Sequence, residues 1–205
     1  STEAVRETAG EVLKYKGNIV TTYYYSTSCG KTTTMKAWGT SENESNGYLQ
    51  SVEVKDKKGD YEKSLPWYRW EADIDQDILS TLLAENVKKN IGTVQTLEVT
   101  KTGPGGVALQ IKAVGDKGSI TVDTENKIRK ALGGNGYEIK KQDGTVAQSG
   151  TLLPSAFFKV KKAGNIFKIT GGGYGHGIGM SQNGANEMAK TGKNYQEILQ
   201  MFYPG

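Results

Sequence analysis

The sequence predicts an α+β protein: a mixed, strand-rich core with short helices and a small α+β insertion in the middle. Composition is the first reason, because 27 glycines and 11 tyrosines with only 4 prolines favour strands joined by tight turns. Periodicity is the second, because short segments with the alternation of strands recur along the chain, whereas helical spacing is confined to a few stretches. A chain of 205 residues is also long enough to bury a substantial core.

The first 65 residues are expected to begin with a short amphipathic helix at 2–8, which Gly10 ends. The tripeptide Lys16-Gly17-Asn18 is typical of a hairpin turn. Strands in this part are expected at 11–15, 19–25 and 48–54.

Residues 66–134 are predicted to form an inserted α+β subdomain, and residues 1–65 with 135–205 the core domain that carries the site. Asp75 and Asp77 offer capping carboxylates to a helix whose apolar residues continue at helical spacing to Val87. Strands are expected at 67–74, 96–100, 107–114 and 119–122, and a short helix at 124–132.

The last part of the chain is expected to start with a hairpin over 137–150, turning at Asp143-Gly144. Two further strands then lead into a glycine-rich run, and two helices follow it. These strands are expected at 157–160 and 166–170, and these helices at 181–189 and 195–202.

The glycine-rich run is the most informative stretch of the sequence. Every second residue from Gly171 to Gly179 is glycine, and His176, the single histidine of the chain, lies among them. Glycine accepts positive φ and lets another backbone or a ligand come close, yet within regular structure it costs roughly 0.5–1 kcal/mol relative to alanine. The pattern therefore indicates a functional site.

Charge and composition narrow the functional class. The net charge is +4, and the lysines are spread along the chain without the dense basic block of a nucleic-acid-binding protein. An acidic polymer remains a compatible partner. The sequence shows no apolar run near the ~20 residues that span a bilayer and no secretion signal. The single cysteine cannot form an internal disulfide.

Several motifs together resemble the stage II sporulation protein D (SpoIID/LytB) family. Residues 171–185, Gly-Gly-Gly-Tyr-Gly-His-Gly-Ile-Gly-Met-Ser-Gln-Asn-Gly-Ala, and residues 195–205 resemble the C-terminal part of that family. Residues 25–32, Tyr-Ser-Thr-Ser-Cys-Gly-Lys-Thr, resemble its middle section. The stretches 129–133 and 153–158 resemble its approach to the last strands, so that the resemblance covers the chain almost from end to end.

The resemblance implies work on peptidoglycan during sporulation and engulfment of the forespore. Members are lytic transglycosylases, or amidase-enhancer relatives, that act outside the cytoplasmic membrane on glycan strands stripped of stem peptides. The transglycosylases cleave the bond between N-acetylmuramic acid (MurNAc) and N-acetylglucosamine (GlcNAc) and leave a 1,6-anhydro end. One acid/base carboxylate suffices for that reaction, whereas ordinary glycosidases need a pair.

The resemblance also implies where the catalytic acid is. The family's glutamate lies in an N-terminal helix with a pattern like Glu-Ala-Leu-Lys-Ala-Gln, and no segment of this sequence matches it. The acid is therefore expected outside this chain. Glu3, Glu7 and Glu11 have four-residue spacing, but we interpret them as solvated carboxylates. The alternative function is a non-catalytic peptidoglycan-binding or amidase-enhancer module.

Partners and location follow from the same resemblance. Peptidoglycan glycan strands are the expected partner, with other cell-wall hydrolases beside them and no nucleic acid. The protein is expected to be extracytoplasmic, facing the cell wall, and anchored in the membrane through a segment absent from this chain.

Four candidate site residues lie in the glycine-rich run or directly after it. His176 is predicted to support catalysis by donating to a sugar hydroxyl, relaying a proton or orienting the acid; the alternative is a structural hydrogen bond. Tyr174 is predicted to stack on a pyranose ring or to pack on a neighbouring strand. Ser181 and Gln182 are predicted to bind substrate at a helix start, where free N–H groups gather, and the alternative for Ser181 is an N-cap.

A second group of candidates follows the strand at 19–25. Ser26, Thr27 and Ser28 form a polar shelf suited to glycan hydroxyls and acetamides, although a Ser/Thr turn without ligand explains them as well. Cys29 is a candidate reactive or metal-linked thiol, with a buried inert thiol as the alternative. No cofactor is expected: the metal is unknown, and zinc would need ligands outside this chain, because one Cys and one His cannot fill a tetrahedral site.

Overall fold

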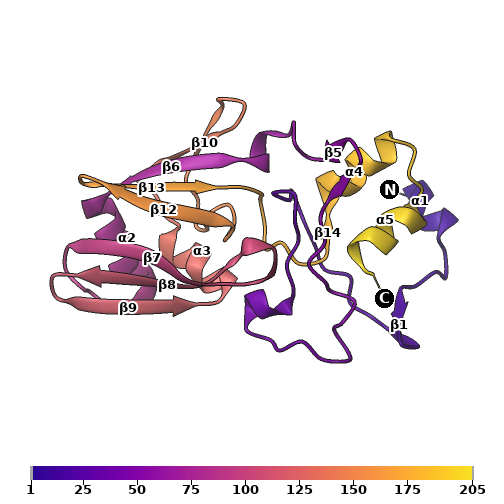
Figure 1. The fold of residues 1–205 in the computed structure, drawn as a ribbon, viewed down its shortest axis with the longest axis horizontal. Helices are drawn as coiled ribbons and strands as arrows, with labels where there is room; N and C mark the ends of the chain where they lie inside the picture. Colours follow the sequence, from indigo (N-terminus) through magenta and orange to yellow (C-terminus); the bar gives the residue numbers. More distant parts are fainter. Residues whose placement is uncertain (1, 205) are drawn as a thin grey trace.

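The computed structural model describes residues 2–204, and the fold is α+β, as predicted. Two sheets with two helices occupy one side of the molecule, and the remaining helices lie with both chain termini on the other side (Figure 1). Within the described residues, no helix is long and apolar enough to cross a bilayer.

The larger sheet is antiparallel, five-stranded and ordered β11-β10-β6-β13-β12. Its central strand β6 alternates, with Trp70, Ala72 and Ile74 buried on one face and acidic residues exposed on the other. This alternation is what a sheet with one solvated face requires. The strands are β6 (Trp70–Asp75), β10 (Glu138–Lys141), β11 (Val146–Gln148), β12 (Phe158–Ala163) and β13 (Ile166–Gly171).

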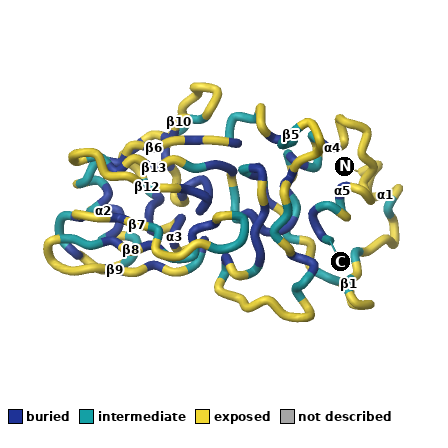
Figure 2. The backbone as a smooth tube through the Cα atoms, in the orientation of Figure 1, coloured by how far each residue is buried: buried dark blue, intermediate teal, exposed yellow. Residues whose placement is uncertain are grey.

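The smaller sheet is a three-stranded meander of β7 (Val94–Thr102), β8 (Ala108–Gly115) and β9 (Gly118–Asp123). Helix α2 (Gln76–Val87) contacts β6 of the larger sheet and β7 of the smaller one, and helix α3 (Glu125–Leu132) packs on β8 and β9. The apolar side chains of both sheets and both helices therefore share one core, which Figure 2 shows as the buried inner stretches of these elements.

The other side of the molecule is built from short elements around a parallel pair of strands. Strand β3 (Tyr24–Tyr25) pairs with β14 (Met180–Ser181), which joins segments more than 150 residues apart. Helix α4 (Gln182–Lys190) follows β14 directly, with Ser181 as its N-cap. The remaining elements here are α1 (Thr2–Glu7), β1 (Lys14–Tyr15), β2 (Asn18–Ile19), β4 (Lys55–Asp56), β5 (Gly59–Asp60) and α5 (Tyr195–Phe202).

The prediction of a strand at 48–54 is wrong, because this segment is a loop. Its backbone pairs with the loop at 30–32 instead of with a strand: the Val54 N–H donates to the Gly30 carbonyl at 2.9 Å, and the Val52 N–H donates to the Thr32 hydroxyl at 2.8 Å. The apolar residues that produced the alternating pattern, Tyr48 and Val54 among them, are buried as loop residues of the core. Burial without a partner strand gives the same pattern as a strand.

The predicted division into a core and an inserted subdomain stays a prediction. Strand β6 belongs to the predicted insertion 66–134, and it pairs on its two sides with β10 and β13 from the predicted core. The boundary near residue 66 coincides with the short 3₁₀ helix at Pro66–Tyr68, which leads into β6. This arrangement places Trp67 and Arg69 beside the glycine-rich run.

Candidate functional site

The glycine-rich run follows β13 and passes against the loop after β3. Gly173 and Gly179 have φ of 80° and 73°, which few other residues tolerate. A Cβ at Gly179 would collide with the carbonyl oxygen of Tyr23, and one at Gly173 would lie 2.9 Å from the carbonyl oxygen of Thr27. Close backbone contact between 171–179 and 23–29 therefore requires these glycines.

His176 is held by its own backbone surroundings. Its Nε2 lies 3.0 Å from the carbonyl oxygen of Tyr24, and its Nδ1 accepts the N–H of Ile178 at 3.1 Å. This pairing corresponds to the neutral ring with the proton on Nε2. Burial lowers the pKa of His176, and the Glu125 carboxylate and the Tyr24 carbonyl oppose that shift only in part. The aromatic rings of Tyr25 and Trp38 pack near the imidazole, with centroids 5.5 and 5.1 Å away.

The supporting catalytic role of His176 stays a prediction, and the geometry favours a structural role. Both ring nitrogens are engaged by backbone groups, so that proton relay or donation to a sugar would first break one of those bonds.

Two of the predicted substrate-binding serines instead hold a buried carboxylate, that of Glu62. The Glu62 side chain is fully buried. Its Oε1 accepts the N–H of Ser28 at 2.9 Å and the hydroxyl of Ser181 at 2.6 Å, and its Oε2 accepts the Ser28 hydroxyl. Ser181 also caps α4 through the Gly184 N–H, 3.2 Å from its Oγ. This cluster of Glu62, Ser28 and Ser181 joins the loop after β3 to the start of α4.

Burial raises the pKa of Glu62, and the hydrogen bonds from Ser181, Ser28 and the Gly184 backbone pull it back in part. The residue is a positioning group, since no face of its carboxylate reaches solvent. Sequence reasoning missed Glu62, because it lies in the polar stretch 56–64, whose composition is typical of a surface loop. No sequence signal identified it.

The other predicted binding residues differ in exposure. Thr27 and Tyr174 exchange two backbone hydrogen bonds, of 3.1 and 2.8 Å, and Asn183 donates to the Thr27 hydroxyl at 2.9 Å. Thr27 is buried, whereas Ser26 is partly exposed and Gln182 is exposed. The structure thus brings the two predicted groups together around β3 and β14, with the buried members serving as internal links.

Tyr174 presents an aromatic face to solvent. Its side chain is 43% exposed, and its ring packs on Trp67 with centroids 4.7 Å apart and an interplanar angle of 49°. The ring thus packs on Trp67, in the 3₁₀ helix before β6, and its stacking on a pyranose ring stays a prediction.

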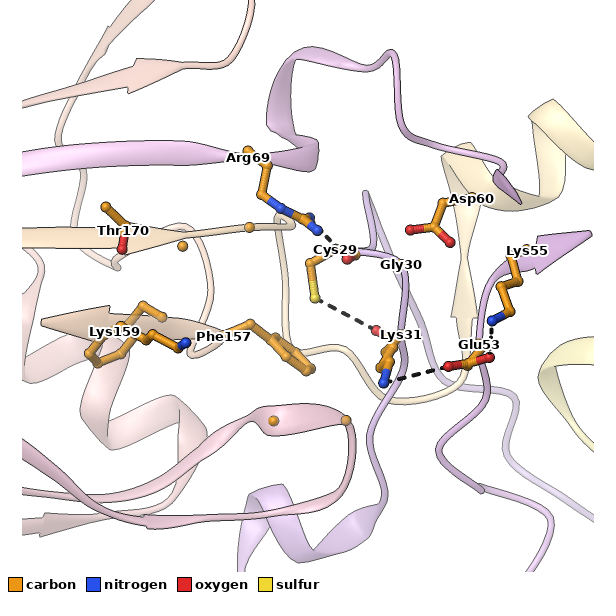
Figure 3. Close-up of a pocket in the computed structure, with 15 residues that line it drawn as sticks. Cys29, Gly30, Lys31, Glu53, Lys55, Asp60, Arg69, Phe157, Lys159 and Thr170 are labelled. Carbon is orange, nitrogen blue, oxygen red and sulfur yellow. Dashed lines mark hydrogen bonds and ion pairs between the residues drawn. The ribbon is translucent and has the colours of Figure 1, made fainter. Parts of the chain in front are cut away.

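A cleft of about 650 Å³ lies where the loop after β3, the β4–β5 hairpin and the ends of β12 and β13 meet (Figure 3). Phe157 and the backbone of Gly171 and Gly172 form part of its wall, and Cys29 lies at its edge. Its charged lining residues are Lys31, Glu53, Lys55, Asp60, Arg69 and Lys159. The cleft is large enough for a saccharide-sized ligand.

Cys29 is the predicted reactive or metal-linked thiol. Burial raises the pKa of this thiol, with the nearby Arg69 opposing the shift only in part. A thiol with a raised pKa is a weak nucleophile and a poor metal ligand. Neither nitrogen of His176 is free for zinc, and residues 2–204 contain no group of three or more His, Cys, Asp or Glu side chains arranged for a metal ion. The residues of this chain therefore do not fit a zinc site.

Comparison with known proteins agrees with this fold and these motifs. Residues 34–179 match a family described as Domain of unknown function (DUF8618). The chain is similar to stage II sporulation protein D of Bacillus subtilis (strain 168), with 31% identity over 100% of this chain and 49% of the relative. It is similar to the amidase enhancer of the same organism, with 28% identity over 99% of this chain and 32% of the relative.

The chain is also similar to an uncharacterized protein of Brachyspira hyodysenteriae (strain ATCC 49526 / WA1), with 41% identity over 44% of this chain and 25% of that protein. The matches to the two Bacillus subtilis relatives cover the glycine-rich run and the Ser-Thr-Ser-Cys-Gly loop, since they extend over 99–100% of this chain. The chain belongs to the stage II sporulation protein D (SpoIID/LytB) family and carries the DUF8618 domain. It spans about half the length of the stage II sporulation protein D relative and about a third of the amidase enhancer.

Proposed function

We propose that the cleft binds a glycan strand of the bacterial cell wall, and that the chain is the substrate-holding part of a lytic transglycosylase. The bond cleaved would be the MurNAc–GlcNAc bond of strands without stem peptides, in cell-wall remodelling during sporulation. The observation that carries the proposal is the cleft itself, whose lining combines the aromatic side chain of Phe157 with charged groups and with the two glycines Gly171 and Gly172. Saccharide sites combine an apolar face with a few placed polar groups in this way.

An aromatic pair, in which Tyr174 is exposed and Trp67 is half-buried, extends this surface. Trp67 and Tyr174 pack together two residues along the chain from Arg69 and Gly172, both of which line the cleft. A sugar presents flat C–H faces, so that an accessible tyrosine beside the cleft offers a place for a second ring. Ser26 and Gln182 lie near this surface with accessible side chains and are proposed to contact the strand.

The Glu53 carboxylate, which lines the cleft, does not resemble a general acid. Glu53 lies between Lys55 at 2.5 Å and Lys31 at 3.5 Å, and the hydrogen bond from Lys55 lowers its pKa. A general acid must hold its proton near neutral pH, which needs a raised pKa. Glu62 has a raised pKa but is fully buried. We therefore propose that the catalytic acid comes from outside residues 1–205, as the family resemblance implies.

The test of this proposal uses the full-length protein and purified glycan strands freed of stem peptides. Formation of 1,6-anhydro ends, detected by mass spectrometry, is the expected result. Strands that bind but remain uncut would overturn the transglycosylase proposal. Strands that do not bind at all would overturn glycan recognition as well.

A second candidate function is a non-catalytic module that stimulates a cell-wall amidase. Two observations favour it: the hydrogen bond from Lys55 lowers the pKa of Glu53, which lines the cleft, and the relative described as an amidase enhancer is similar over 99% of this chain. Addition of the full-length protein to a purified peptidoglycan amidase separates the two functions. Faster release of stem peptides, without anhydro ends, is the result expected of the module.

Location, partners and cofactors are proposed together with this function. A protein that acts on cell-wall glycan works outside the cytoplasm, with peptidoglycan and other cell-wall hydrolases as its partners, and we propose an anchor in a segment outside this chain. No nucleic-acid partner and no resident cofactor are proposed. Protease accessibility of the protein on intact protoplasts tests the location.

A further inference from the structure

We infer that the cleft recognises carboxylate groups of the glycan strand, and that Arg69, with Lys159, makes this contact. The inference rests on the proposed binding of a cell-wall glycan and adds the chemical feature that is recognised. It starts from the excess of cations among the residues that line the cleft, where Lys31, Lys55, Arg69 and Lys159 face only Glu53 and Asp60. An acidic polymer complements such a surface.

Most of the negative charge in the cleft is already engaged. The Glu53 carboxylate is shared by Lys55 at 2.5 Å and Lys31 at 3.5 Å, and the Asp60 carboxylate accepts the hydroxyl of Tyr68. Among the described residues, no carboxylate forms an ion pair with Arg69 or Lys159. The two cations at the β6 and β12 side of the cleft therefore have their charge available for a ligand.

Arg69 is held in place for such a contact. Its guanidinium lies 3.9 Å from the centroid of the Tyr68 ring, and its Nη1 donates to the carbonyl oxygens of Tyr68 at 2.7 Å and Cys29 at 3.0 Å. These bonds use only one of the three guanidinium nitrogens, and no described residue accepts a hydrogen bond from the other two. Figure 3 shows the guanidinium extending toward Cys29 at the edge of the cleft. A guanidinium with two nitrogens free matches the paired oxygens of a carboxylate.

The backbone beside Arg69 is closely packed. A Cβ at Gly172 would collide with the carbonyl oxygen of Tyr68 at 2.5 Å and would lie 2.9 Å from Cβ of Cys29 and 3.0 Å from Nη1 of Arg69. A side chain at this position would therefore displace the guanidinium or the Tyr68 backbone. The glycine keeps the guanidinium in its observed position.

In a glycan strand without stem peptides, each MurNAc carries a free lactyl carboxylate. An attached stem peptide converts that carboxylate into an amide and contributes carboxylates of its own, farther from the sugar ring. Both sources share one chemistry, and the experiment separates them. Neutral oligomers of GlcNAc contain neither.

The experiment measures binding of the full-length protein to four probes: peptide-free strands, the same strands with the lactyl carboxyl reduced to an alcohol, strands with intact stem peptides, and GlcNAc oligomers. We expect carboxyl reduction to weaken binding at least about tenfold, because a charge-assisted pair is lost. Binding should also weaken with added salt, because the exposed charges are screened. Peptide-free strands that bind more tightly than intact ones would identify the lactyl group as the source, and the reverse order would identify the stem peptide.

The variant Arg69→Gln is expected to reduce binding of peptide-free strands at least about tenfold and to leave binding of carboxyl-reduced strands unchanged. A cleft that had merely lost its shape would lose both probes equally, which would overturn the inference. Arg69→Lys should bind peptide-free strands with an affinity between those of wild type and Arg69→Gln, because lysine keeps the charge and loses the paired geometry of the guanidinium. Lys117→Gln, in the exposed turn between β8 and β9, removes the same charge away from the cleft and should bind like the wild type.

Failure of the inference and failure of the proposed function give different results. Equal binding of the acidic, reduced and neutral probes would overturn carboxylate recognition and leave glycan binding in place. No binding to any probe would overturn the proposed function, and the inference with it.

Discussion

Removal of the Glu62 carboxylate should destabilise the protein more than loss of any exposed acid. In Glu62→Ala, the N–H and hydroxyl of Ser28 and the hydroxyl of Ser181 lose their acceptor. The Ser181 hydroxyl has the carbonyl oxygen of Ser26 at 3.3 Å as an alternative, and the Ser28 N–H has the Ser181 Oγ at 3.2 Å, so that the Ser28 hydroxyl is the donor left unpaired. A buried donor without a partner costs about 1–3 kcal/mol.

The expected loss is the difference between two effects. The unpaired Ser28 hydroxyl costs about 1–3 kcal/mol and the two hydrogen bonds that become longer cost about 0.5–1.5 kcal/mol each, and removal of a buried carboxylate returns part of that sum by sparing its desolvation. We expect a net loss of about 2–4 kcal/mol, a large share of the ~5–15 kcal/mol by which a domain is stable. Glu62→Gln should lose about 1–2 kcal/mol, because its carbonyl oxygen still accepts two hydrogen bonds while its amide nitrogen cannot accept the Ser28 hydroxyl.

Urea unfolding followed by tryptophan fluorescence and circular dichroism measures these differences, with a shared m-value as the check on two-state behaviour. Glu71→Ala is the matched control, because Glu71 is exposed and pairs only with the exposed Lys140 at 3.3 Å. This control should stay within about 0.5 kcal/mol of wild type. If the free energy of unfolding of Glu62→Ala also stayed within about 0.5 kcal/mol of wild type, the reasoning on the buried cluster would be refuted.

Four further outcomes follow from the structure. Burial raises the folded-state pKa of Glu62 above its unfolded value of roughly 4.3. The stability that the wild type gains from Glu62 is therefore fully present below roughly pH 4.3 and is lost as pH rises through the folded-state pKa. The difference in free energy of unfolding between wild type and Glu62→Gln, measured in urea, should therefore shrink as pH rises. Burial lowers the pKa of His176, so that its contribution is present above roughly pH 6.5 and lost as pH falls through the folded value. His176→Gln should remove that loss between pH 7.5 and 5, and an unchanged pH profile would contradict the neutral ring. Tyr174→Ala should weaken glycan binding several-fold, measured by co-sedimentation with glycan strands, and unaltered binding would exclude a contact between Tyr174 and the strand. Asn194→Ala should lower the free energy of unfolding by about 1 kcal/mol by breaking the capping box of α5. An unaltered urea unfolding curve would exclude that role of Asn194.

Local sequence patterns predicted most of the secondary structure. The helix from Gln76 to Val87 begins at the Asp75 cap and ends as expected, and the hairpin of β10 and β11 turns around Asp143-Gly144. Capping, helical spacing and turn chemistry act within a few residues, so that the sequence shows them directly. The strand predicted at 48–54 was wrong because alternation records burial, and burial alone does not supply a partner strand.

The candidate site was predictable in part. The glycine-rich run and the loop at 26–29 were both identified, and the structure places them side by side through the bridge between Thr27 and Tyr174. Ser28 and Ser181 were predicted to bind substrate, with a Ser/Thr turn and an N-cap as the alternatives, and the structure shows Ser181 as the N-cap of α4 and Glu62 as a partner of both serines. Arg69 and Trp67 were missed, because a strand start rich in aromatic and charged residues has no pattern that separates a cleft wall from a solvated edge.

The sequence by itself determined the fold class, most of the elements and the family, because these depend on local patterns and on motifs that are read along the chain. Tertiary structure alone decided which polar residues face inward and which cations remain available. Glu62 and Ser181 are 119 residues apart, and Arg69 and Lys159 lie on different strands at the wall of one cleft. Contacts at such separations arise only when β3 pairs with β14 and β6 enters the larger sheet, since the packing of the whole chain sets the burial and charge around each side chain.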